Sequence, residues 1–244
     1  MTCSQLNKQK YIDISSLIRY NVSESGSSSD GRGSIYMSRG SIELTNARRE
    51  EIISACEKLY QTMSFKEITL KDIAGATSFT RTSIYNYFQT KEEIFLALMQ
   101  KEYERWVEEL NAMASDYTTM SAESFSSMLA HSLEKRSMLL KLLSMNHFDM
   151  EENSRPECLV DFKRAYGASI EALRGCLVKF FPDMDAKAQQ DFLYAFMPFL
   201  YGIYPYTTVS AKQRQAMSGA GLNFVYMSVY DIAFNCIRTL LGSK

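Results

Sequence analysis

Apolar residues recur at helical spacing along most of the chain beyond residue 45. In the first such stretch Ile52, Cys56, Leu59 and Met63 follow at intervals of four, three and four, so they share one helical face. Similar stripes continue toward the C-terminal end, and no stretch shows the alternation and hairpin turns of paired strands. We therefore predict an all-α protein. The expected helices cover, in chain order, a stretch from residue 46, another from 70, then 80–87, 90–114, 121–134, 136–146, 157–181, 186–204 and 213–241.

Side-chain caps divide the region before residue 94 into short helices. The sequences TLKD at 69–72 and TKEE at 90–93 are capping boxes, in which a threonine accepts a bond from the third amide and the acid reaches back. Thr80 is a further N-cap. Two short helices are therefore expected between a long first helix and a long fourth one.

Composition places few limits on function. The formal net charge is −1 and 46% of residues are apolar, so any charged interface must be local. The five cysteines have no C-x-x-C spacing, which favours a reducing cytoplasm and buried thiols over disulfides or a metal site. Residues 20–41, rich in Ser and Gly, predict a flexible N-terminal extension over 1–44. The longest uncharged run, from Phe192, contains two prolines and many tyrosines, so we expect no membrane span.

Catalytic motifs are missing from the sequence. It contains two histidines, no H-E-x-x-H, no Gly-rich phosphate loop and no nucleophile elbow. We therefore expect a protein that is not an enzyme and that needs no cofactor.

An acid-free segment runs from Ile73 to Thr90 and includes the stretch TSFTRTSIYNYF. DNA is a polyanion, so a helix that lies in its major groove must present no Asp or Glu, while Ser, Thr, Asn and Tyr supply hydrogen bonds. Two short capped helices between longer ones are typical of a helix-turn-helix DNA reader. Residues 45–91 hold seven Lys or Arg and five Asp or Glu, a net of +2. The same pattern also suits an ordinary piece of helical core.

The sequence TLKDIAGATSFTRTSIYNYFQTKEEIF at 69–95 resembles the TetR (tetracycline-repressor-like) family of regulators. In that family an Ile-Ala pair, a turn, a Tyr-x-Tyr/His-Phe run and a Lys-Glu-Glu-Leu/Ile helix start occur in this order. The resemblance covers about residues 46–105, and it departs from the family at the turn, where Ser78 replaces the usual glycine. It implies a DNA-binding head at 45–91, followed at 92–244 by a connector helix and an effector-binding and dimerising body.

The resemblance also implies roles for single residues of the head. The positions that read bases in the family correspond to Lys71, Arg81, Thr82 and Tyr85. Those that meet the phosphate backbone correspond to Thr69, Ser83, Asn86, Tyr87 and Lys91. For the two tyrosines, packing inward stays open as an alternative.

The last helices of the body carry more apolar residues than are needed to pack one face of each helix on the rest of the protomer. Its last two expected helices are apolar around most of their circumference, which predicts a symmetric homodimer through a four-helix bundle, similar to the family. The candidate interface residues are Phe196, Phe199, Leu222, Tyr226, Val229, Ala233 and Ile237. The alternative is that these stripes are only the core of one protomer.

Methionines and aromatic residues of the body suit an adaptable cavity for a small, largely apolar effector, although such residues at helical spacing also form plain core. The candidate pocket residues are Asn146, His147, Phe162, Tyr166 and Tyr201. His147 could equally be solvated.

The sequence therefore predicts a cytoplasmic, ligand-responsive transcription regulator, a repressor that binds a pseudo-palindromic operator in double-stranded DNA as a dimer. The alternative is an all-helical interaction module whose head binds a protein. Binding to random duplexes that falls steeply with salt would separate the two, because phosphate contacts release counterions.

Overall fold

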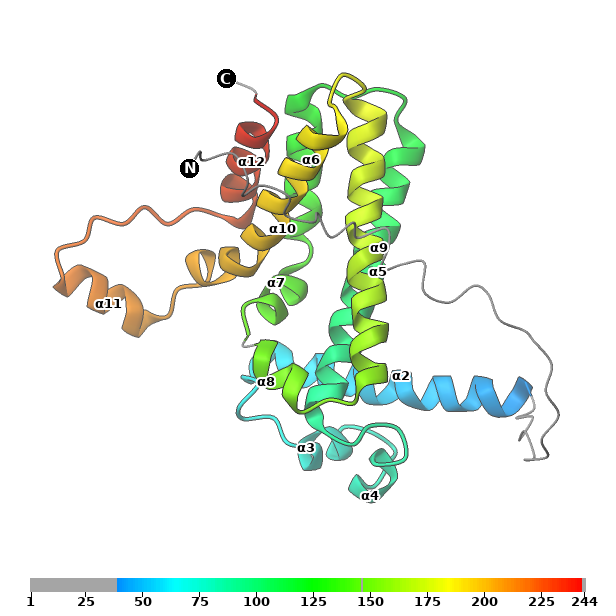
Figure 1. Cartoon of the computed structure of the whole chain (residues 1–244). Coiled ribbons are helices and arrows are strands. Elements are labelled where there is room, and N and C mark those ends of the chain that lie inside the picture. The colour runs from blue at the N-terminus through cyan, green and yellow to red at the C-terminus, as the bar shows by residue number, and fades with distance from the viewer. Residues whose placement is uncertain (1–38, 146, 243–244) are drawn as a thin grey trace, which may run out of the picture. The chain divides into compact units, whose positions relative to one another are not determined.

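Side-chain caps set the start of most helices in the structure. The computed structural model describes residues 39–145 and 147–242, and in these ranges the chain forms eleven helices and no strand (Figure 1). The N-caps that accept a bond from the first turn are Thr69, Thr80, Thr90, Ser121, Asp185, Ser210 and Ser228. The helices are α2 (Arg39–Thr62), α3 (Leu70–Gly75), α4 (Arg81–Ile84), α5 (Lys91–Asp116), α6 (Ala122–Glu134), α7 (Ser137–Leu143), α8 (His147–Glu152), α9 (Pro156–Phe180), α10 (Ala186–Thr207), α11 (Ala211–Gly219) and α12 (Val229–Leu240).

The all-α prediction is confirmed, and most helix bounds lie close to the expected ones. Two bounds near the head differ. Helix α2 begins at Arg39, so the last residues of the range 1–44, expected to be a flexible extension, are helical; residues 1–38 of that prediction lie outside the described residues. Helix α4 ends at Ile84, and 85–87 form a turn where the third helix was expected to continue.

The prediction of one last helix over 213–241 is wrong. Helix α11 ends at Gly219, and Gly221, with φ of 68°, takes the left-handed conformation that closes a helix. A non-helical segment follows, until Ser228 and Asp231 form a capping box that opens α12. Leu222 and Tyr226 therefore lie outside any helix.

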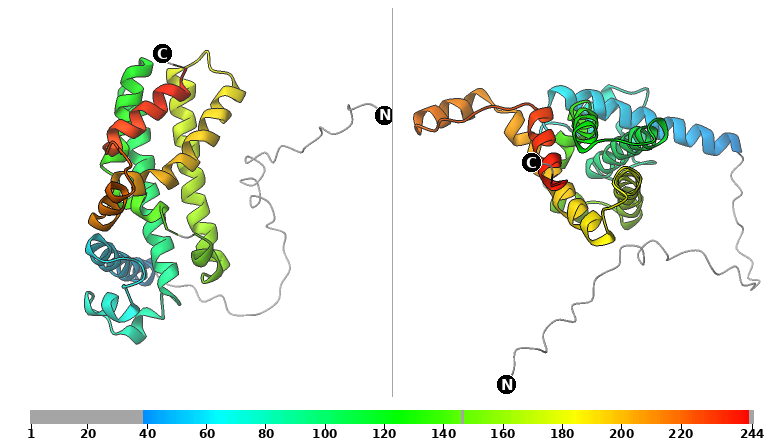
Figure 2. Two further views of the ribbon diagram at one scale, coloured as in Figure 1. Left: turned by 90° about the vertical axis from the view of Figure 1, so that its left-hand side faces the viewer. Right: turned by 90° about the horizontal axis from the view of Figure 1, so that it is seen from above.

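The core of the body is built around α5. This helix buries Tyr103, Trp106 and Leu110 completely and packs along the length of α9 (Figures 1 and 2). The indole nitrogen of Trp106 donates to the Ser132 hydroxyl of α6 at 3.1 Å, so the polar edge of this buried ring has a partner. Helix α12 packs on α6 and α10 and closes the body on that side. No helix of the described residues is long and apolar enough to cross a membrane.

Helix α5 also joins the body to the helices before it. The Phe95 ring near its start meets the rings of Tyr60 and Phe65 edge to face, with centroids 5.0 and 4.8 Å away. Farther along α5, Arg105 pairs with Glu57 of α2 at 2.9 Å. Both contacts tie α2 and the segment after it to the connector helix.

A buried carboxylate holds the first turn of α5 against the start of α9. The Glu93 side chain is fully buried, and its oxygens accept from Arg155 Nε at 2.7 Å, from Arg155 Nη2 at 3.0 Å and from the Gln89 amide at 2.8 Å. Burial alone would raise the pKa of Glu93, but the hydrogen bonds from Arg155 and from the backbone outweigh it, so the pKa lies below its ordinary value. Glu93 is therefore charged in the native state at neutral pH.

We predict that Glu93→Gln lowers the free energy of unfolding by about 3 kcal/mol at pH 7, because it removes the buried anion of Arg155 and leaves that guanidinium only the more exposed Glu157, at 3.4 Å. A lowered native pKa stabilises the fold above the unfolded value, near 4.5, and this contribution disappears as the pH falls through the native pKa. The gap between wild type and variant should therefore narrow below about pH 4.5 in urea denaturation. An equal gap at pH 7 and at acid pH would contradict this account.

Candidate nucleic-acid interface

Helices α3 and α4 are joined by a turn that several short hydrogen bonds hold. The Thr77 hydroxyl donates to the Ala74 carbonyl at 3.0 Å and accepts from the Phe79 amide at 3.2 Å. The Ser78 amide donates to the carboxylate of Glu51, on α2, at 2.6 Å, and this bond lowers the pKa of Glu51. The segment that lacks the family's usual glycine is therefore fastened to the first helix by an acid of that helix.

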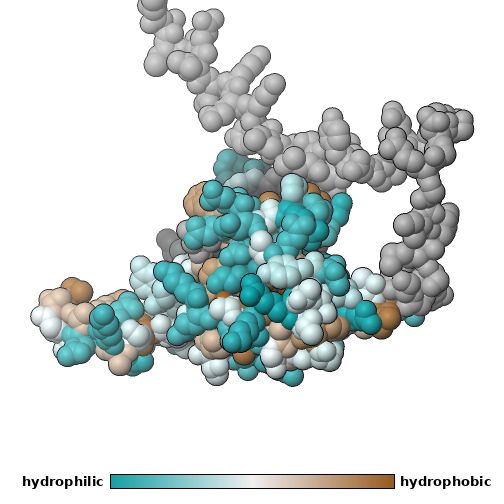
Figure 3. Space-filling view, turned by 90° about the horizontal axis from the view of Figure 1, so that it is seen from below, coloured by the Kyte–Doolittle hydropathy of each residue, from teal (hydrophilic) through white to brown (hydrophobic). Residues whose placement is uncertain are grey.

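The aliphatic and polar residues of α4 lie on opposite sides. Ile84 and Phe88 are fully buried in the same apolar core as Ile52 and Ile73, which anchors the short helix from behind. The polar residues Arg81, Thr82, Tyr85 and Asn86 are exposed. The helix thus presents an acid-free hydrogen-bonding face, and Figure 3 shows mostly hydrophilic and neutral residues at this end of the molecule.

Predicted DNA contacts from three separate segments meet at one groove of about 520 Å³. Thr69 and Lys71 line it from the start of α3, Arg81 from α4, and Lys91 from the start of α5; the N-cap Thr90, which was not among the predicted contacts, lines it too. The Arg81 guanidinium also donates to the Tyr85 hydroxyl at 3.2 Å, so the two residues expected to read bases lie side by side. The groove therefore gathers two exposed cations with threonine hydroxyls.

The acidic residues of the head are occupied elsewhere. Glu67 accepts from the Ser64 amide at 2.7 Å, and Asp72 accepts from the Thr69 amide at 2.9 Å, and these bonds lower the pKa of both carboxyls. Glu57 pairs with Arg105, and Glu50 with Lys101. These carboxylates face protein partners, so the charged side chains that line the groove are those of Lys71, Arg81, Lys91 and Glu92.

Four of the predicted phosphate contacts have protein partners of their own, and one of them, Tyr87, bonds to Arg48. The Lys91 ammonium donates to the carbonyls of Phe65 at 2.8 Å and Ile68 at 3.2 Å and lies over the Phe65 ring. The Thr69 hydroxyl is bonded to Asp72, and the Ser83 hydroxyl lies 2.9 Å from that of Thr80. Contacts of these residues with phosphate stay predictions, and each side chain also stabilises the head.

One exposed cation beside this surface was not found by sequence reasoning. Arg48 of α2 donates through Nη1 to the Tyr87 hydroxyl at 3.2 Å, while Arg49 lies over the Phe88 ring and bonds to the Tyr87 carbonyl. Tyr87 is half-buried and Tyr85 exposed, which answers the question of which ring packs inward. No local pattern in the sequence reveals a contact between residues 39 positions apart.

Four of the five predicted effector residues gather in the body; Asn146 lies outside the described residues. Phe162 and Tyr166 of α9 surround Tyr103 of α5, with ring centroids at 6.2 and 5.6 Å, and His147 meets Tyr201 at 4.9 Å. Burial, with smaller contributions from Tyr201 and Tyr166, raises the pKa of Tyr103 well above its ordinary value. Its hydroxyl makes no hydrogen bond of good geometry among the described residues, although the side chain of Tyr201 lies close enough to affect its pKa. Tyr103 is not among the effector residues predicted from the sequence.

The predicted dimer residues divide into three groups by burial. Phe196, Ala233 and Ile237 are completely buried within one protomer, so this part of the prediction is wrong and the alternative of protomer core holds for them. Leu222 and Tyr226 are exposed, although on the loop between α11 and α12 and not on a helix. Phe199 and Val229 are partly buried.

The helix-turn-helix head and the helical body together define a class, the two-part bacterial regulators. Residues 52–98 match the family of bacterial regulatory proteins called tetR, and residues 100–230 match the tetracycline repressor-like C-terminal domain. The second match alone spans more than half of the chain. The chain belongs to the TetR family.

Individual relatives are distant. The HTH-type transcriptional regulator RutR of Escherichia coli K12 is 24% identical over 93 residues, which cover 35% of this chain and 44% of RutR, so the chain spans less than half the length of that relative. A TetR-family regulator from Mesorhizobium loti has a TM-score of 0.55 at 14% identity, over 81% of this chain and 96% of that one. The fatty acid degradation regulator FadR from Bacillus halodurans has a TM-score of 0.51 at 15% identity, over 80% and 94%. At these identities the structures show a common fold.

We predict that Thr69→Val lowers the free energy of unfolding by about 1 kcal/mol, because it removes the hydroxyl of the capping box while keeping the shape of the side chain. Thr82→Val makes the same change on the exposed face of α4 and should leave stability within about 0.5 kcal/mol of wild type. Urea denaturation of both variants measures the difference. Equal stabilities would show that the cap does not hold α3 in place.

Proposed function

We propose that this protein is a dimeric, ligand-responsive transcription repressor that binds a pseudo-palindromic operator through two helix-turn-helix heads. The observation that carries the proposal is the groove where Lys71 and Arg81 meet, beside the exposed polar face of α4. Membership of the TetR family and the likeness to RutR, a transcriptional regulator, support it. The protein acts without catalysis and in the cytoplasm.

The charge of the head favours two heads that act together. A net of +2 over residues 45–91 gives each head only a small electrostatic attraction to DNA. Arg81 and Lys71 suit the guanine edge in the major groove, and Arg48 suits a phosphate beside it. Two modest half-sites one helical turn apart gain affinity when one dimer holds both.

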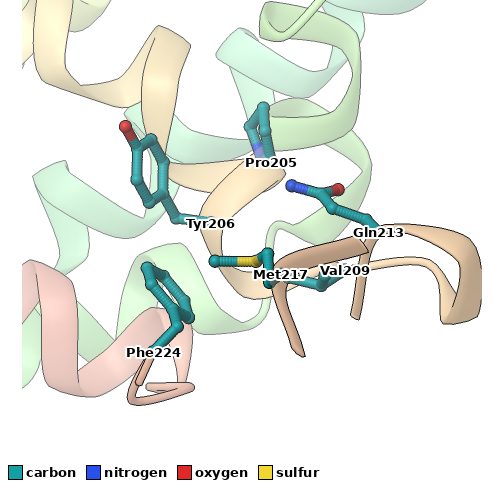
Figure 4. Close-up of a pocket in the computed structure, with 6 residues that line it drawn as sticks. All are labelled: Pro205, Tyr206, Val209, Gln213, Met217 and Phe224. Atoms are coloured by element: carbon teal, nitrogen blue, oxygen red, sulfur yellow. The ribbon is translucent and has the colours of Figure 1, made fainter. Parts of the chain in front are cut away.

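The partner protomer is proposed to cover an arm that projects from the body. Helix α11 buries none of its residues, and Leu222, Val225 and Tyr226 in the following loop are exposed, Val225 by 74% (Figure 1). This arm, residues 211–227, packs against the end of α10. A pocket of about 310 Å³ lies there, with Met217 and Phe224 of the arm near Tyr206 of α10 (Figure 4). Exposed apolar side chains of this extent favour association with another surface.

The body is proposed to bind a small, largely apolar effector near Tyr103, whose buried hydroxyl would supply a hydrogen bond. Tyr103 lies on α5, the helix that also begins beside the head. A ligand that favours one position of α5 would shift the spacing of the two heads, which changes affinity for the operator through a difference between two states.

We predict that Arg81→Ala weakens binding to a selected operator by about 1 to 3 kcal/mol and relaxes base choice at one position of each half-site. Arg48→Ala is the matched control, since it removes an exposed guanidinium placed to meet phosphate. It should weaken selected and random duplexes by similar factors and reduce the salt slope by about 1. Fluorescence anisotropy with both duplexes over a range of salt measures both effects. If Arg81→Ala weakened the two duplexes equally, its base-reading role would be refuted.

We predict that the double variant Leu222→Asp, Tyr226→Asp weakens dimerisation by about 2 to 4 kcal/mol, because both carboxylates would enter an apolar contact. Asn223→Asp places one carboxylate in the same loop at an exposed polar position and should leave the dimer intact. Sedimentation equilibrium gives the mass of each variant, and circular dichroism checks that the helices persist. A double variant as dimeric as wild type would remove the arm from the interface.

A further inference from the structure

A groove of about 520 Å³ lies where the head meets the body, and its lining shares no residue with the Tyr103 cluster. It is formed by the end of α2 and the segment after it, by α7 and α8, and by the last turns of α10 (Figure 1). Its floor includes Tyr60, Phe65, Met150 and Tyr204, and most of its lining is apolar. This size lies within the range of small-molecule sites.

Lys141 of α7 brings a positive charge into this apolar groove. Its ammonium donates to the carbonyls of Tyr60 and of Met63, the latter at 3.3 Å, and lies 3.9 Å from the centre of the Tyr60 ring. Burial lowers the pKa of Lys141, which shows that its surroundings do not favour the charge.

The charge of Lys141 has no full counter-charge. Both acceptors are carbonyls, and the carboxyl end of a helix offers only about half a negative charge. Asp149 and Lys66 line the groove from exposed positions, and no carboxylate of the described residues lies within ion-pair distance of Lys141. An ammonium has three N–H donors, and two are used by carbonyls. One N–H donor of Lys141 and most of its positive charge therefore remain available to a ligand in the groove.

We propose that this groove binds a small apolar monocarboxylate, with the carboxylate on Lys141 and the apolar part between Phe65 and Tyr204. A ligand carboxylate would give Lys141 the full negative charge and the charge-assisted hydrogen bond that the two carbonyls do not supply. The apolar part of the ligand would match the apolar lining of the groove. The occupied groove acts on the head, because Tyr60 and Phe65 also pack on Phe95 at the start of α5. This regulatory part rests on the proposed DNA-binding function, whereas binding to the groove does not.

The test of binding uses the full chain with four probes. Octanoate and 2-naphthoate supply the carboxylate, while 1-octanol and octylamine keep the apolar chain and change the head group. Calorimetry and thermal melting should show octanoate binding about tenfold tighter than 1-octanol, the ratio that one charge-assisted hydrogen bond supplies. Octylamine should bind more weakly than the alcohol. Equal affinity for octanoate and 1-octanol, or no binding of either carboxylate, would overturn the proposal.

Three variants locate the site. Lys141→Gln should reduce the preference for octanoate to within about twofold, whereas Lys135→Gln, which removes an exposed ammonium paired with Glu109, should keep it. Because Lys141→Gln also removes bonds to α2, Ser64→Trp serves as a second variant: it fills the groove from an exposed rim position and leaves Lys141 untouched. It should abolish octanoate binding without loss of fold. Octanoate binding unchanged in either Lys141→Gln or Ser64→Trp would overturn the assignment.

The regulatory part has a separate readout. Octanoate should change the affinity of wild type for a selected duplex by at least about fivefold and leave that of Lys141→Gln unchanged. If octanoate binds as proposed and the affinity for DNA stays constant, the regulatory part is overturned. If wild type binds no duplex at all, the proposed function fails, and calorimetry still decides whether the groove binds carboxylates.

Discussion

The architecture depends on two neighbouring contacts at the start of α5, an aromatic cluster and a buried ion pair. Phe95 packs on Tyr60 and Phe65 of the head side, and two residues earlier Glu93 binds Arg155 at the start of α9. A single helix therefore has its first turn in the head and its remaining length in the body core. Protein interiors are packed as tightly as crystals of small molecules. A shift of α5 in the body therefore displaces the residues of the head that pack on it.

The recognition helix can be short because other residues of the head hold it in place. Helix α4 has only four residues, too few to be stable alone, and it is held by its Thr80 cap and by Ile84 and Phe88 beneath it. Its exposed side carries hydrogen-bonding groups, and the acids of the head are bonded to amides or to basic residues elsewhere. The surface thus combines a rigid base with a modest positive charge, which favours specificity over indiscriminate attraction to DNA.

Much of this could be predicted from the sequence, because the signals are local. The capping box at Thr69, the N-cap at Thr90 and the four-three-four stripes give the helices of the head almost directly, although Glu93 bonds Arg155 and the Gln89 amide and does not complete the box expected at Thr90. The break between α11 and α12 was missed because Leu222 and Tyr226 continue the period of Val229 by coincidence, while Gly221 ends the first helix and the Ser228–Asp231 box starts the second. Burial of Phe196 and Ala233 inside one protomer could not be foreseen, since an apolar stripe does not say which surface covers it. The place of Arg48 beside Tyr87, and of Lys141 at the end of α2, depends on tertiary packing alone.

The central claim is that the outer face of α4 and the groove of Lys71 and Arg81 read DNA. Its most direct test is selection of bound fragments from random duplexes, followed by hydroxyl-radical footprinting of the enriched sequence. The account predicts a two-fold symmetric sequence with two protected half-sites whose centres lie about 10 base pairs, or a multiple of that, apart. Failure to enrich any sequence, or one protected patch without symmetry, would contradict it.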